Sequence, residues 1–72
     1  MGFFRRKEEE LAMRLLAWQY HKKGMPVPKA AEIRAQAEAV VDQAHAIAKK
    51  RGKNVLSIMK QAATDFVNRP KP

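Results

Sequence analysis

Helix-breaking residues divide this sequence into three long stretches, and that division constrains the fold more than any other feature. The breaks, each containing glycine or proline, lie at residues 24–28, 52–54 and 70–72. Between the breaks, apolar residues recur at helical spacing and alternate little in the way that strand residues do. The sequence therefore predicts an all-α fold. The expected helices span about residues 3–23, 28–51 and 55–68.

Length and cysteine content limit how such helices can be stabilised. The chain has 72 residues and no cysteine, so neither disulfide bonds nor thiolate metal sites can hold it together. A chain this short buries only about 60% of its unfolded surface. Helices joined by short loops then predict one small three-helix bundle over residues 1–69, followed by a Pro/Lys tail at 70–72. Residues 1–7 are either a flexible basic and aromatic N-terminus or a segment docked on the bundle.

The expected helix ends carry residues suited to them. Gly24 and Gly52 follow Lys- and Arg-containing last turns, and glycine readily takes the left-handed conformation that ends a helix. Pro28 suits the first turn of the second helix, where its missing N–H would have no partner. Asn54 is the expected N-cap of the third helix.

The first expected helix is apolar on more than one side. Its two stripes consist of Leu11, Leu15 and Trp18, and of Met13, Leu16 and Tyr20. An ordinary surface helix has one stripe, so we expect a homodimer through this helix. The alternative is a compact monomer in which this helix is simply the central one. The candidate protein-interface residues are Met13, Leu16, Trp18 and Tyr20.

Catalytic patterns are lacking in this sequence. Ser57 and Thr64 stand neither in a glycine-rich turn nor beside a histidine, so no nucleophile is set up by a neighbouring base. The glycines, at positions 2, 24 and 52, form no phosphate-binding loop. We therefore expect no enzyme, no catalytic residue, no cofactor and no small-molecule substrate.

One face of the second helix carries a set of metal-binding residue types. Glu38, Asp42 and His45 follow one another at spacings of four and three residues. The residues of a bundle metal site project inward. These three residues do not lie on the apolar side of the helix that contains Ile33, Val40 and Ile47, so they are expected to face water. No second carboxylate–histidine pair completes a set, so no metal is expected.

Positive charge suggests a function. Fifteen Lys and Arg residues against seven Asp and Glu give a net charge of +8, which attracts polyanions. The junction of the second and third helices concentrates this charge, and it predicts nucleic-acid binding. The candidate residues are Lys49, Lys50, Arg51, Lys53 and Lys60. Ser57, Gln61 and Thr64 could extend the surface along the third helix. The alternative is a protein-interaction or regulatory adaptor module that uses the apolar surface of the first helix.

The N-terminus carries a second cluster of cations beside two aromatic residues. Its members are Phe3, Phe4, Arg5, Arg6 and Lys7. They could contact an anionic membrane or another polyanion, but one short patch anchors a protein only marginally. We therefore rank membrane contact below the other two functions. No apolar run is long enough to cross a bilayer and no signal peptide is evident, so we expect a cytoplasmic protein.

Overall fold

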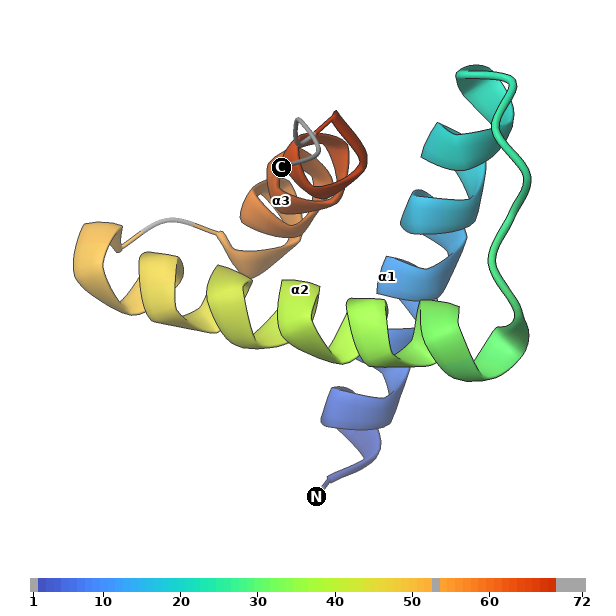
Figure 1. Ribbon diagram of the computed structural model, residues 1–72. Helices are drawn as coiled ribbons and strands as arrows, with labels where there is room; N and C mark the ends of the chain where they lie inside the picture. The colour runs from blue at the N-terminus through green and yellow to red at the C-terminus, as the bar shows by residue number, and fades with distance from the viewer. Residues whose placement is uncertain (1, 53, 69–72) are drawn as a thin grey trace.

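The computed structural model describes residues 2–52 and 54–68, and these form three helices that all pack against one another (Figure 1). The helices are α1 (Phe3–Lys22), α2 (Ala30–Arg51) and α3 (Val55–Asn68). No strand occurs within the described ranges. The prediction of a small all-α three-helix bundle is confirmed, and the predicted tail at 70–72 lies outside the described residues.

The helices are arranged so that α2 lies across the other two (Figure 1). An extended segment between residues 22 and 30 leads from the end of α1 back to the start of α2. The last turns of α2 project past α3 (Figure 1). The N-terminal turns of α1 project past α2 on another side of the molecule. Residues 3–7 form the first turns of α1.

The helix ends follow the local signals of the sequence. Gly24 has a φ of 71° and donates its N–H to the carbonyl of His21, at 3.0 Å between nitrogen and oxygen. Met25 donates to the carbonyl of Tyr20 at 2.9 Å. Together these two bonds make a Schellman motif, which satisfies carbonyls that the helix leaves open.

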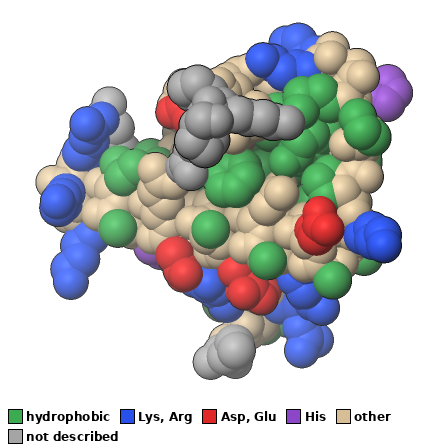
Figure 2. All heavy atoms as spheres, in the orientation of Figure 1, with side chains coloured by type: hydrophobic (Ala, Val, Ile, Leu, Met, Phe, Trp, Pro, Cys, Tyr) green, Lys and Arg blue, Asp and Glu red, His purple; other side chains and the backbone are tan. Residues whose placement is uncertain are grey.

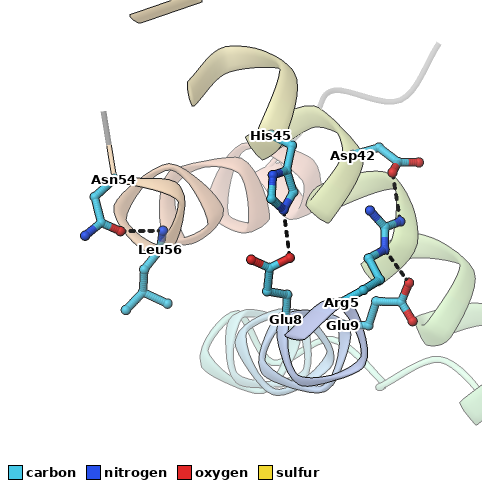
Figure 3. Close-up of polar contacts among 7 residues, drawn as sticks. All are labelled: Arg5, Glu8, Glu9, Asp42, His45, Asn54 and Leu56. Carbon is cyan, nitrogen blue, oxygen red and sulfur yellow. Dashed lines mark hydrogen bonds and ion pairs between the residues drawn. The ribbon is translucent and has the colours of Figure 1, made fainter. Parts of the chain in front are cut away.

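Gly52 at the end of α2 and Asn54 before α3 have the roles predicted for them. Gly52 has a φ of 66°, and its N–H donates to the carbonyl of Ala48 at 2.7 Å. The side-chain oxygen of Asn54 accepts a hydrogen bond from the backbone N–H of Leu56 at 2.7 Å (Figure 3). Asn54 is therefore the N-cap of α3, as predicted.

The predicted start of α2 was wrong by two residues. The helix begins at Ala30, and its N-cap is Lys29, whose ψ of 158° is extended. Pro28 therefore lies before the helix and not in its first turn. The residue that precedes a proline is biased away from the helical conformation, and Pro26 and Pro28 together keep this segment extended.

Small side chains fill much of the core. The buried hydrophobic residues are Ala12, Leu16, Tyr20, Ile33, Ala37, Val40, Val41, Ala44, Met59, Ala62, Ala63 and Val67. Alanines let the three helix backbones approach closely, but each buries little apolar area, so the bundle has a limited hydrophobic reserve. The largest fully buried side chains are Leu16, Met59, Val40 and Val41.

The second apolar stripe of α1 faces this core. Leu16 is 0% exposed and Tyr20 is 9% exposed. The hydroxyl of Tyr20 donates to the side-chain oxygen of Gln36 on α2 at 2.9 Å. Leu16 and Tyr20 are therefore core residues of a single chain, so their expected place on an open surface is corrected. A homodimer stays a prediction, but it is not needed to cover this stripe.

Candidate nucleic-acid interface

Three cations occupy the last turn of α2. Lys49, Lys50 and Arg51 are all exposed. Cations are favoured at this end of a helix because the dipole leaves partial negative charge on the last carbonyls. Gly52 then ends the helix and turns the chain away, which leaves the three side chains at the projecting end of α2. Figure 2 shows Lys and Arg side chains gathered at that end of the molecule.

This α2-end cluster (Lys49, Lys50 and Arg51) is not neutralised by carboxylates in the described part of the chain. The ion pairs found there join Arg5 to Glu9 and Asp42, and His45 to Glu8. No carboxylate among those residues lies within 4.0 Å of a cluster nitrogen. The full charge of the cluster therefore remains available to an anion.

Two further residues, Lys53 and Lys60, were predicted to belong to the interface. Lys60 is exposed near the middle of α3. Lys53 lies outside the described residues. The described part of the predicted interface thus comprises three cations in the last turn of α2 and one cation on α3.

A groove of about 410 Å³ lies between α2 and α3 and begins at the cluster. Arg51 and Ser57 line its end near the junction, and Gln43 and Asp65 line it farther along the two helices. Gln61 donates to the carboxylate of Asp65 at 2.9 Å. Since a carboxylate repels phosphate, the groove favours an anion only at its junction end.

The exposed side of α3 provides few free groups to read bases. Thr64 is half-buried, and its hydroxyl accepts a hydrogen bond from Gln19 at 2.9 Å and donates to the carbonyl of Lys60 at 3.0 Å. The helix carries one cation, Lys60, and one carboxylate, Asp65, so it has no net charge. The arrangement therefore offers contacts to phosphates and lacks the converging donors and acceptors that base recognition needs.

The N-terminal cluster behaves differently, because Arg5 binds carboxylates of its own chain. Its Nε donates to Glu9 and its Nη2 donates to Asp42, each at 2.8 Å (Figure 3). The hydrogen bond to Glu9, and next the one to Asp42, raise the pKa of the Arg5 guanidinium. Arg5 thus links α1 to α2 and is a structural residue, whereas Arg6 and Lys7 are exposed.

Asp42 and His45, on one face of α2, make the contacts with α1. His45 Nε2 lies 2.7 Å from Glu8 Oε1, beside the pair between Arg5 and Asp42 (Figure 3). Asp42 and His45, which were predicted to face water, therefore also contact α1. Both contacts join residues 37 positions apart, so only the crossing of the two helices reveals them. Within the described ranges, no three metal-ligating side chains gather.

Trp18 is the one predicted interface residue that stands well exposed. Its side chain is 57% exposed, and the ammonium of Lys22 lies 4.9 Å from its ring centroid. Met13 is partly buried and packs against the core. Of the four candidates, Trp18 alone therefore offers a large apolar surface to a partner.

Neither the hydropathy of the helices nor comparison with known proteins gives a further indication of function. No helix of the described residues has the length and apolarity to cross a bilayer. No protein-family model matches the sequence, and no curated protein or solved structure is significantly similar to it.

Proposed function

We propose that this protein binds nucleic acid through phosphate contacts made by the α2-end cluster. The single observation that carries the proposal is the exposure of Lys49, Lys50 and Arg51 at the projecting end of α2, without a carboxylate partner among the described residues. A duplex carries one negative charge about every 1.7 Å along its axis, so a compact group of cations can neutralise several phosphates.

The binding is expected to be independent of sequence. Phosphate contacts position a protein on a duplex, and contacts to base edges specify the sequence. Thr64 accepts a hydrogen bond from Gln19, and Gln61 donates one to Asp65, so α3 supplies little for base recognition. The net charge of +8 adds long-range attraction to any polyanion.

The test is the salt dependence of duplex DNA binding by the wild type and by an α2-end variant, Lys49→Gln/Lys50→Gln/Arg51→Gln. Each cation that contacts a phosphate contributes about 0.9 to the slope of log affinity against log salt. The variant should therefore bind more weakly at low salt and lose about 2.7 from that slope. Two unrelated duplex sequences should bind the wild type with equal affinity.

Thermal unfolding of the same variant provides the control. The three cations also favour the end of α2 electrostatically, by about 0.3–1 kcal/mol each, so a modest fall in Tm is expected beside the loss of binding. A variant whose Tm falls while DNA affinity and salt slope stay unchanged would show that the cluster serves only the helix. That result would overturn the proposal.

A further inference from the structure

The outward side of α1 combines large apolar residues with cations. At 100° per residue, six residues share an arc of about 80°. This α1 outer face consists of Phe4, Lys7, Leu11, Arg14, Trp18 and Lys22. Phe4, Leu11 and Trp18 form a straight line at seven-residue spacing that extends about 21 Å. Every cation in the set is exposed, and the arc contains no carboxylate.

The two aromatic members of this face project well into solvent. Phe4 is 80% exposed and Trp18 is 57% exposed, while Leu11 is partly buried between them. Phe3 lies beside Phe4 in an edge-to-face contact and is 68% exposed. The bundle buries smaller side chains while leaving these exposed, so burial within one chain does not explain their presence.

Each end of the face places a cation against an aromatic ring. The ammonium of Lys7 lies 5.4 Å from the centroid of Phe3, and that of Lys22 lies 4.9 Å from the centroid of Trp18. Lys7 and Arg6 also stand in the first two turns of α1, where the helix dipole disfavours positive charge. The helix dipole therefore does not account for these two cations.

We infer that the α1 outer face docks on an anionic lipid bilayer. Phe and Trp side chains enter the boundary between head groups and acyl chains, while Lys and Arg lay their aliphatic stems along it and bind lipid phosphates. The face is the convex outside of a helix, which suits a broad surface. This surface is larger than the N-terminal patch visible in the sequence, because folding adds Arg14, Trp18 and Lys22 to it.

Electrostatic repulsion argues against a second copy of the chain as the partner of the α1 outer face. A two-fold interface would bring this face against itself. The three cations Lys7, Arg14 and Lys22 of one copy would then face the same three cations of the other copy, with no carboxylate in the arc to separate them. Like charges brought together repel. An anionic bilayer meets the same three cations with complementary charge.

Trp18 is the single tryptophan of the chain, so its fluorescence reports directly on the face. With vesicles of phosphatidylcholine mixed with phosphatidylserine, we expect its emission to move to shorter wavelength. With phosphatidylcholine alone, or at high salt, the shift should largely disappear. Phe4→Ser should weaken partitioning about tenfold. The control Leu56→Ser removes a partly exposed side chain from α3 and should leave partitioning unchanged.

An α1-face variant, Lys7→Gln/Arg14→Gln/Lys22→Gln, tests the charge. Each cation near an anionic surface contributes about 1 kcal/mol, so this variant should partition about a hundredfold more weakly. The α2-end variant removes the same charge elsewhere and should keep most of its partitioning. Unchanged partitioning in the α1-face variant, or equal loss in both variants, would overturn the inference. It would also fail if single-stranded oligonucleotide quenched Trp18 in the wild type while vesicles produced no shift.

Discussion

The two apolar stripes of α1 look alike in the sequence but are buried to different extents in the fold. Leu11 and Leu15 of the first stripe are only partly buried against the core. Leu16 and Tyr20 lie in the core among alanines of α2 and α3, whereas Phe4 and Trp18 are exposed beside cations. The difference teaches that hydrophobicity along one helix does not say which stripe is buried. Packing against α2 and α3 decides which stripe is buried, and that packing depends on how the three helices are arranged.

Leu16→Ala should have the largest effect of the changes that test this contrast. Leu16 is 0% exposed and among the largest fully buried side chains. Removing it from a packed core costs about 2–5 kcal/mol, which is a large part of the stability of so small a domain. Urea unfolding followed by circular dichroism measures the change. A loss below about 1 kcal/mol would mean that this stripe is not the packed one.

Tyr20→Phe should have the next largest effect. The ring stays in the core, but the hydrogen bond to Gln36 is lost and its half-buried amide oxygen loses its partner. We expect a loss of about 1 kcal/mol. In a Gln36→Ala background the same change should cost much less, since the bond is already absent. Equal losses in both backgrounds would contradict a coupled pair.

Arg5→Gln should cost about 0.2–1 kcal/mol, because its two ion pairs are partly exposed. The raised pKa of Arg5 stabilises the fold below the pKa of the unfolded guanidinium, and this contribution is lost only as pH rises through the folded value. The cost should therefore persist at neutral pH and shrink at high salt. Unfolding at low and high salt measures it, and a cost that salt leaves unchanged would contradict an ion pair.

Trp18→Gln should have the smallest effect on folding. An exposed side chain outside the core usually changes stability by less than about 0.5 kcal/mol, although the contact with Lys22 is also lost. Urea unfolding of the Trp18→Gln and Leu16→Ala variants, measured side by side, compares the contributions of the two stripes to stability. Similar losses for the two variants would mean that both stripes support the fold.

Local signals predicted the helices well. Gly24, Gly52 and Asn54 act through their own backbone conformation or through a neighbour two residues away, so their roles follow from the sequence. The start of α2 was missed because Pro28 can either open a helix or keep the preceding chain extended. Which of these two roles Pro28 takes depends on the path of the chain from α1 to α2.

The candidate site could be predicted only in part. The α2-end cluster is contiguous in the sequence and was found there. The pairing of Arg5 with Asp42 and of His45 with Glu8 depends on how α1 and α2 cross, which no spacing along one helix reveals. For the same reason, the helical spacing of Leu16 and Tyr20 did not show that α2 and α3 cover them.

The most direct measurement asks whether the position of the cations, and not their number, governs nucleic-acid binding. The α2-end variant and the α1-face variant each replace three cations with glutamine. Their affinities for one duplex DNA should be measured together across a range of salt concentrations. We expect the α2-end variant to lose affinity and about 2.7 units of salt slope, while the α1-face variant retains both nearly unchanged. Equal losses in the two variants would contradict a defined interface at the end of α2.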